Sequence, residues 1–321
     1  MEADPHPAVA FHIHLVVIPR IVKLDLFSDF NVSYPDTEPL CSAEWIRNHL
    51  DRFQSDTPDY RLVEVDMDPE VYDEWHIPGA VQINWEEDII DGLGGNVIDP
   101  AEAESLFGEL GITQDTTVVV YGDQANWFAG HAYWVLKYYQ HADVKMLDGG
   151  RRYWRIQDYV QTQSVPEYPS QEYVIEGTNE RIRGYKDDIL ETLSEERPII
   201  DVRNPQEYRG EKPPAEIPNT TDREGHIPTA DNVPWGKAVN ADGTFKPESA
   251  LRDIYGDYIG AENSAVAYCR IGERSSVTWF VLSELLGADA VNYDGSWTEW
   301  AADEEAPVET KTPPTAEEGD D

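Results

Sequence analysis

Cys269 lies in a setting suited to nucleophilic chemistry. It directly follows the apolar run 265–268, which predicts a buried strand, and it precedes a helix expected to begin near Ser275 or Ser276. Free N–H groups and the dipole at a helix N-terminus favour an anion, and the thiolate is the nucleophilic form of cysteine. Gly272 allows the intervening loop a left-handed turn that brings its N–H groups round to a ligand. We therefore predict that Cys269 is a reactive nucleophile.

Two arginines flank this cysteine and should favour its thiolate. Arg270 and Arg274 form a local positive island in an acidic chain, suited to orienting a small dianion. The alternative reading of Cys269 as a small buried hydrophobe is disfavoured by this context. Cys41 has no comparable context and precedes a helix with Ser42 as its cap, so it is treated as incidental. The predicted substrate-binding loop comprises Arg270, Ile271, Gly272, Glu273, Arg274 and Ser275.

The elements that must position this loop occur twice in the chain. Residues 71–80 and 84–85 match 207–210, 225–230 and 234–235, residues 118–123 match 265–269, and residues 147–154 match 293–300. The same order in both halves indicates a duplicated domain. Asp123 is expected to stand in the first copy where Cys269 stands in the second.

Each copy is predicted to be an α/β domain with a mostly parallel sheet flanked by helices. Expected strands cover 62–65, 117–121, 199–202 and 265–268, and expected helices cover 101–110, 128–139 and 276–286. Gly111 and Gly287 fit helix C-termini. The predicted organisation is an N-terminal extension at 1–39, a first domain at 40–156, a linker at 157–183, a second domain at 184–302 and a disordered acidic tail at 303–321.

Composition limits the partners and the compartment. The chain of 321 residues has 24 Lys and Arg against 63 Asp and Glu, a net charge of −39 that would be repelled by nucleic acid and by anionic membranes. Acid spread along the whole chain favours a salt-adapted microbial cytoplasm over an ordinary acidic protein. Two cysteines make no disulfide framework, which indicates a reducing compartment. The apolar run 9–18 is too short to span a bilayer, and its two histidines lack partner ligands for a metal.

The ordered motifs resemble the tandem rhodanese family, over residues 40–302. The resemblance rests on the Cys-Arg-x-Gly-x-Arg loop at 269–274, Asp-Val-Arg at 201–203, Gly-His-Ile-Pro at 225–228 and Asp-Gly-Ser-Trp at 294–297. It implies two tandem rhodanese-like domains and a thiosulfate sulfurtransferase that moves sulfur through a Cys269 persulfide. It implies no metal and no organic cofactor. The first domain is then inactive, because the carboxylate of Asp123 cannot carry sulfur.

The resemblance also implies supporting roles for residues around the loop. Asp201 and Arg203 are expected to support it by hydrogen bonds, and Trp297 is expected to line the cleft. Two departures from the vertebrate enzymes stand out. Glu207 occupies the place of an arginine, and Ile271 occupies the place of a lysine, so that Arg274 is expected to take over the binding of the donor anion.

Several functions stay open. The partners implied are thiosulfate and a thiophilic acceptor such as cyanide, with a protein acceptor as a possibility. A 3-mercaptopyruvate sulfurtransferase is one alternative, although Arg270 and Arg274 favour thiosulfate. A persulfide carrier serving a dedicated partner is another. A cysteine phosphatase is disfavoured, because four residues separate Cys269 from Arg274 where a phosphate loop needs five.

Overall fold

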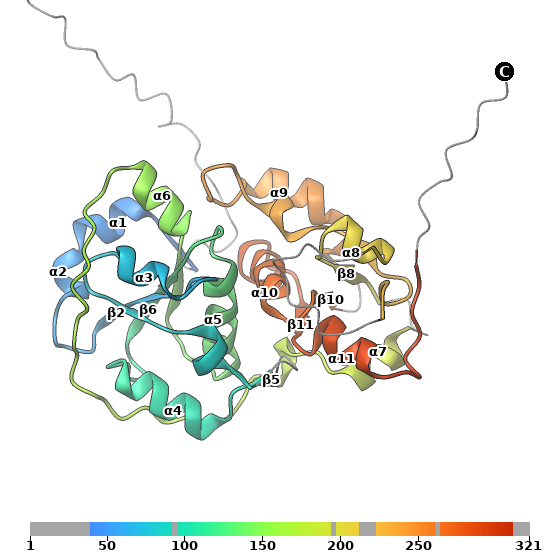
Figure 1. Ribbon diagram of the computed structural model, residues 1–321, viewed down its shortest axis with the longest axis horizontal. Coiled ribbons are helices and arrows are strands. Elements are labelled where there is room, and N and C mark those ends of the chain that lie inside the picture. Colours follow the sequence, from blue (N-terminus) through green and yellow to red (C-terminus); the bar gives the residue numbers. More distant parts are fainter. Residues whose placement is uncertain (1–38, 92–95, 194–196, 212–222, 261–263, 311–321) are drawn as a thin grey trace, which may run out of the picture. The chain divides into compact units, whose positions relative to one another are not determined.

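The computed structural model describes residues 39–91, 96–193, 197–211, 223–260 and 264–310 (Figure 1). The predicted extension at 1–39 therefore lies almost wholly outside the described residues, as does the tail from residue 311. Within the described part, two sheets carry the fold, one in each predicted copy.

The first sheet has five strands, all parallel, in the order β1-β7-β6-β2-β3. Its central strand β6 reads Thr-Val-Val-Val-Tyr and is buried along nearly its whole length, as expected for a parallel strand covered on both faces. A short antiparallel pair, β4 and β5, lies outside this sheet. The strands are β1 (Leu40–Cys41), β2 (Tyr60–Glu64), β3 (Ala80–Gln82), β4 (Ile90–Asp91), β5 (Asn96–Val97), β6 (Thr117–Tyr121) and β7 (Val144–Leu147).

Helices connect the strands of the first sheet. The helix expected at 101–110 is α4, whose start is fixed by Pro100 and by a capping box between Asp99 and Glu102. Gly111, just past its end, has a φ of 74°, which confirms its predicted role. The helices are α1 (Ala43–Asn48), α2 (Leu50–Phe53), α3 (Val71–Glu74), α4 (Pro100–Glu109), α5 (Trp127–Tyr138) and α6 (Gly150–Ile156), with a π-helical turn at Trp85–Ile89.

The second sheet repeats this arrangement. Its order is β11-β10-β8-β9, again all parallel, and an isolated parallel bridge between Arg183 and Asn292 occupies the edge that β1 takes in the first sheet. The α/β fold with two similar, mostly parallel sheets is therefore confirmed. The strands are β8 (Ile199–Asp201), β9 (Asp231–Asn232), β10 (Ala265–Tyr268) and β11 (Ala290–Tyr293).

The helices of the second copy follow the same pattern. One helix begins earlier than expected, since α10 starts at Glu273 rather than near Ser275 or Ser276. The helices are α7 (Lys186–Thr192), α8 (Pro205–Arg209), α9 (Glu248–Tyr255), α10 (Glu273–Phe280) and α11 (Ser296–Ala302), with a π-helical turn at Val281–Leu285 and 3-10 turns at Glu180–Ile182, Trp235–Ala238 and Gly256–Tyr258.

The two copies share one hydrophobic core. A single cluster of buried side chains includes residues of the first copy, such as Trp134, and of the second, such as Phe280. The contact is close, because a Cβ added to Gly130 of α5 would lie 2.7 Å from a methyl carbon of Val277 in α10. Packing of this density fixes the first copy against the helix that follows Cys269.

The segments next to the second domain also have defined places. The expected linker runs along the first domain in extended form, where the Tyr168 hydroxyl donates to the carbonyl of Phe53 at 2.6 Å (Figure 1). The start of the expected tail packs on the second domain, where Glu309 and His226 exchange backbone hydrogen bonds. The Trp300 indole donates to the carbonyl of Pro307 at 2.9 Å.

Candidate active site

The loop that carries Cys269 is short and tightly held. Cys269 follows β10 directly, and Gly272 caps α10 with a φ of 95°. Only glycine fits here, because a Cβ would lie 2.7 Å from the Cα of Asp294 in addition to the unfavourable φ. In this loop Ile271 is partly exposed, whereas the other residues from Cys269 to Ser275 are buried. The structure thus brings the predicted loop residues together around one sulfur atom.

The sulfur of Cys269 makes two hydrogen bonds. The backbone N–H of Gly272 donates to Sγ at 3.2 Å, and the thiol donates to Oε2 of Glu273 at 3.2 Å. The side chain is fully buried. Burial raises the pKa of the Cys269 thiol above its ordinary value, and the charge of Glu273 raises it further, against a lowering by Arg274. The expectation that the loop favours the free thiolate is therefore wrong for this state of the site, because the carboxylate and the burial outweigh the nearby arginine.

Glu207 pairs with both arginines of the loop. Arg270 donates to Oε1 of Glu207 at 3.0 Å, and Arg274 donates to Oε2 at 2.8 Å, with all three side chains buried. Burial alone would raise the pKa of Glu207, but the arginines, led by Arg274, lower it to about 2. The predicted positive island is thus a buried triad in which the carboxylate of Glu207 offsets one of the two positive charges. The sequence marked Glu207 as a departure from relatives, without indicating that it pairs with both arginines.

Asp201 and Arg203 support the loop indirectly, through the strand that precedes it. The guanidinium of Arg203 donates to both carboxylate oxygens of Asp201, at 2.6 to 3.1 Å, and to the carbonyl of Gly225 at 2.7 Å. Asp201 also accepts a 2.7 Å bond from the hydroxyl of Tyr268, the residue before Cys269. These two residues therefore hold the end of β10 rather than the loop itself.

Trp297 is part of the support beneath the loop. It is 1% exposed, its ring lies 4.6 Å from the guanidinium of Arg203, and its indole donates to the carbonyl of Arg223. Its backbone N–H donates to the carbonyl of Cys269 at 3.1 Å. The expectation that Trp297 lines a cleft is therefore wrong, because the side chain is buried against Arg203.

Small polar residues complete this support, and of these the sequence singled out Ser275 but not Asn292 or Ser296. Ser296 accepts the N–H of Cys269 at 3.1 Å. The carbonyl of Gly272 accepts hydrogen bonds from Ser275, Ser276 and Asn292, at 2.8 to 3.2 Å. A buried network with so many mutual bonds holds a loop in one conformation.

The first copy reaches this network through α5. His131 lies 3.2 Å from the hydroxyl of Ser276, and the ring of Trp127 lies 5.4 Å from the guanidinium carbon of Arg274. Burial, with a smaller effect of Arg183, lowers the pKa of His131 to about 4, so the imidazole is neutral near neutral pH. The first copy therefore contacts the helix of the cysteine loop with uncharged groups.

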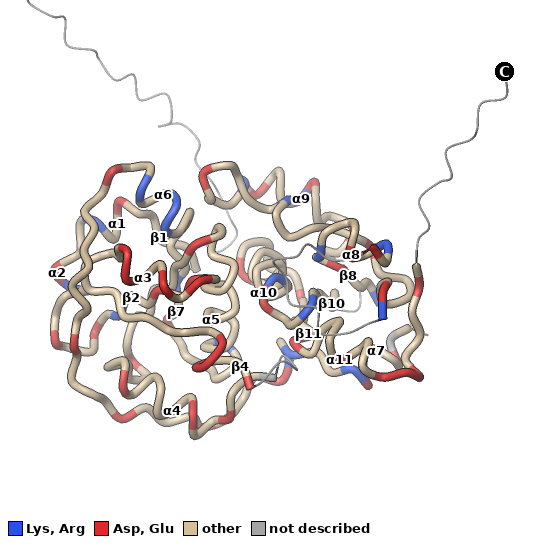
Figure 2. The backbone as a smooth tube through the Cα atoms, in the orientation of Figure 1, with Lys and Arg blue, Asp and Glu red and all other residues tan. Residues whose placement is uncertain are grey.

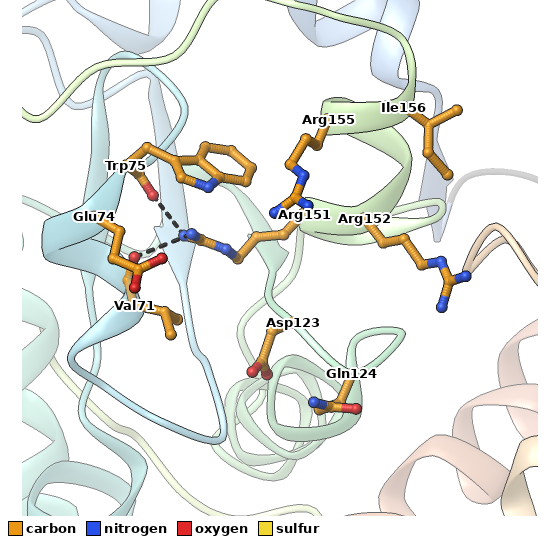
Figure 3. A pocket seen from close by; sticks show the side chains of 9 residues that line it. All are labelled: Val71, Glu74, Trp75, Asp123, Gln124, Arg151, Arg152, Arg155 and Ile156. Atoms are coloured by element: carbon orange, nitrogen blue, oxygen red, sulfur yellow. Dashed lines mark hydrogen bonds between the residues drawn. The ribbon is translucent and has the colours of Figure 1, made fainter.

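The matching place in the first copy holds no thiol, but the expectation that Asp123 occupies it is wrong by one residue (Figure 3). Strand register places Gly122 at the position of Cys269 and Asp123 one residue later, at the position of Arg270, since Tyr121 pairs with Glu64 as Tyr268 pairs with Asp201. Asp123 accepts the N–H of Met67 at 2.8 Å, and burial together with the charge of Asp66 raises its pKa to about 6. This position offers a carboxyl group and no sulfur.

The described residues bear on two kinds of partner, metal ions and membranes. No group of three or more His, Cys, Asp or Glu side chains within these ranges is arranged to hold a metal ion. Among the helices that the structure describes, none has the length and apolar character needed to cross a membrane.

Comparison with known proteins agrees with this geometry. A model of the rhodanese-like domain matches residues 42–157 and again residues 186–303. The chain is 51% identical over 274 residues to a protein of Haloferax volcanii named "Putative thiosulfate sulfurtransferase", covering 84% of this chain and 96% of the relative. It is 45% identical over 279 residues to the "Sulfur carrier protein TtuD" of Thermus thermophilus, covering 84% and 95%.

A solved structure shows the same architecture. The anaerobic ergothioneine biosynthesis enzyme of Chlorobium limicola, in complex with trimethyl histidine, superimposes with a TM-score of 0.76 at 26% identity, covering 87% of this chain and 72% of that one. Both domain matches span the sheets described above, and the second includes the Cys269 loop. The chain is a member of the rhodanese family and carries two rhodanese-like domains in tandem.

Proposed function

We propose that this protein is a sulfurtransferase that takes sulfane sulfur from thiosulfate and passes it to a thiophilic acceptor through a persulfide on Cys269. The observation that carries the proposal is the environment of Sγ, which accepts an N–H from Gly272 and donates to the carboxylate of Glu273. A relative 51% identical that is named for thiosulfate supports this choice of donor.

Glu273 supplies a place for the proton of the thiol. The buried pair carries one negative charge whether the proton sits on sulfur or on Glu273, so transfer over the 3.2 Å contact creates no additional buried charge. The thiolate formed in this way is the attacking group. The N–H of Gly272 then stabilises the charge on sulfur.

The two half-reactions balance in atoms and charge. The Cys269 thiolate attacks the outer sulfur of thiosulfate, a new S–S bond forms, and the S–S bond of thiosulfate breaks as sulfite leaves with the electron pair. Cyanide then attacks the outer sulfur of the persulfide, thiocyanate leaves, and the Cys269 thiolate is restored and can recover its proton from Glu273. Because Cys269 is fully buried, side chains around it must move before a donor reaches the sulfur.

Specific observations favour two alternatives to this choice of donor and acceptor. Arg270 and Arg274 already pair with Glu207, which weakens the argument that they select a dianion over 3-mercaptopyruvate. The carrier alternative, in which the persulfide is delivered to a protein partner, is favoured by the 45% identity to a sulfur carrier protein.

Thiocyanate formation distinguishes these readings. The protein is incubated with cyanide and either thiosulfate or 3-mercaptopyruvate, and thiocyanate is measured. We expect turnover with thiosulfate, retained by Cys41→Ser and abolished by Cys269→Ser, since both cysteines are free and buried but Cys269 alone lies in the loop. Faster turnover with 3-mercaptopyruvate would reassign the donor, and undiminished turnover by Cys269→Ser would refute the proposal.

The division of labour between the copies is part of the same proposal. Residues 40–156 form a domain inactive in sulfur transfer because no thiol stands at the place of Cys269, residues 157–183 link it to a catalytic domain at 184–302, and the tail follows from 303. The net charge of −39 and the two free cysteines support work in a reducing, salt-rich cytoplasm. Activity that persists or rises with added KCl would support this setting, and inhibition at moderate KCl would contradict it.

A further inference from the structure

The first domain contains a pocket of about 500 Å³ beside Asp123, although this domain lacks a sulfur nucleophile (Figure 3). Its volume lies in the range of small-molecule sites. It is built by α3, by the loop after β6 and by α6. The lining residues are Val71, Glu74, Trp75, Asp123, Gln124, Arg151, Arg152, Arg155 and Ile156.

One arginine of the pocket is a fixed part of its wall. Arg151 pairs with the buried Glu64 and donates to the carbonyls of Val71 and Trp75, at 3.0 Å and 2.6 Å. Its guanidinium also lies 3.9 Å from the centre of the Trp75 ring. This arrangement holds the indole in place as an apolar surface.

The other two arginines have no such role. Arg152 and Arg155 are exposed, and within the described ranges neither side chain has a hydrogen bond, ion pair or ring contact. Figure 2 shows the basic residues gathered on α6 in a chain whose net charge is −39. Two unpaired guanidinium groups at one pocket are therefore local exceptions to the charge of the molecule.

The second copy lacks these cations. In the matched helix α11, Thr298 stands at the place of Arg152, and Ala301 stands at the place of Arg155. The fold does not need a cation at either position, since both helices form and pack with different residues there. Their presence in the first copy alone points to a ligand rather than to stability.

We propose that this pocket binds a small organic monoanion, a carboxylate or sulfonate with an apolar body. Arg152 and Arg155 would pair with the anionic group, for which the guanidinium fork is suited. Trp75, Val71 and Ile156 would contact the body of the ligand, and Ile156 is 56% exposed.

The acidic residues of the pocket set the charge of the ligand. Glu74 and Asp123 line it together with the arginines, so a second negative charge on the ligand would be repelled. A compact dianion such as sulfate or thiosulfate also leaves the apolar surfaces uncovered. The site is thereby distinguished from the donor site proposed at Cys269, and it binds its ligand independently of sulfur transfer.

Benzoate is a suitable probe, read by fluorine NMR of protein labelled with 5-fluorotryptophan. The resonance of Trp75 is assigned with Trp75→Phe. We expect it to move saturably with benzoate and to be unaffected by sulfate at the same concentration and ionic strength. Arg152→Gln/Arg155→Gln should weaken binding about tenfold. The matched control Arg47→Gln/Arg52→Gln removes two exposed arginines elsewhere in the first domain and should change the affinity less than about twofold.

Three results would overturn the proposal. These are a Trp75 resonance that does not respond to benzoate, an affinity that the Arg152→Gln/Arg155→Gln variant retains, and binding of sulfate as tight as that of benzoate. Cys269→Ser should bind benzoate like the unmodified protein, which separates this test from the fate of the proposed sulfurtransferase activity.

Discussion

Glu207 offers a quantitative test of how the arginines beside Cys269 are held. This carboxylate is 2% exposed, and the arginines lower its pKa from 4.5 to about 2. A shift of that size corresponds to about 3 kcal/mol of stability. Removing one partner of a buried ion pair costs about 3–5 kcal/mol by comparison with other proteins. Both routes predict that Glu207→Gln lowers the free energy of unfolding by about 3 kcal/mol near neutral pH.

The pH dependence gives this prediction a second signature. Because the pKa of Glu207 is depressed in the folded state, its contribution is present above pH 4.5 and is lost as the pH falls toward about 2. The difference between the unmodified protein and Glu207→Gln should therefore shrink across this window. Urea unfolding followed by tryptophan fluorescence at constant ionic strength measures it.

A surface pair provides the matched control. Glu248 and Arg252 form an ion pair at 2.7 Å in which both side chains are partly exposed, so Glu248→Gln should change the free energy of unfolding by less than about 0.5 kcal/mol. A loss for Glu207→Gln as small as that of the control would refute the argument. A loss that does not change between neutral and acidic pH would refute it as well.

Three further substitutions test the loop and the contact between the copies. Glu273→Gln removes a negative charge beside Cys269, so the midpoint of its alkylation by iodoacetamide should move to lower pH, and an unchanged or higher midpoint would contradict the assignment. Asn292→Ala removes a donor to the carbonyl of Gly272 and should lower the free energy of unfolding by about 1–3 kcal/mol in urea. Gly130→Val adds methyl groups where a Cβ already approaches a side chain of the second copy, and it should cost about 1–3 kcal/mol by the same measurement. For the last two, a change below about 0.5 kcal/mol would show that the contact is unimportant.

The fold was predictable from the sequence because its signals are local and repeated. The apolar runs before Asp123 and Cys269 are buried strands at matching places in two sheets of the same order. Gly111 and Gly287 both have positive φ at the ends of helical segments. A repeat doubles each local signal, so errors in one copy are corrected by the other.

The chemistry of the loop was predictable only in part, because charge depends on contacts distant in sequence. Arg270 and Arg274 both pair with Glu207, which lies more than sixty positions earlier. The thiol is surrounded by folded chain, and that burial raises its pKa, which the local pattern of residues does not reveal. The ring of Trp297 likewise packs against Arg203, a residue that follows a different strand.

The helix start was missed for a different reason. Glu273 is an acidic residue in the first turn, a position that the helix dipole favours, and it is also the acceptor of the Cys269 thiol. With Glu273 assigned to the loop, neither its place in the first turn of the helix nor its hydrogen bond with the thiol was predicted. The structure shows that the partner of the nucleophile is the first residue of the helix.

Intact-mass spectrometry after incubation with thiosulfate, without an acceptor, tests the central claim most directly. We predict that the unmodified protein and Cys41→Ser each gain the mass of one sulfur atom, that a reducing thiol removes it, and that Cys269→Ser gains none. Sulfur retained on Cys269→Ser, or no sulfur on the unmodified protein from either thiosulfate or 3-mercaptopyruvate, would contradict the account of Cys269 as the sulfur-carrying nucleophile.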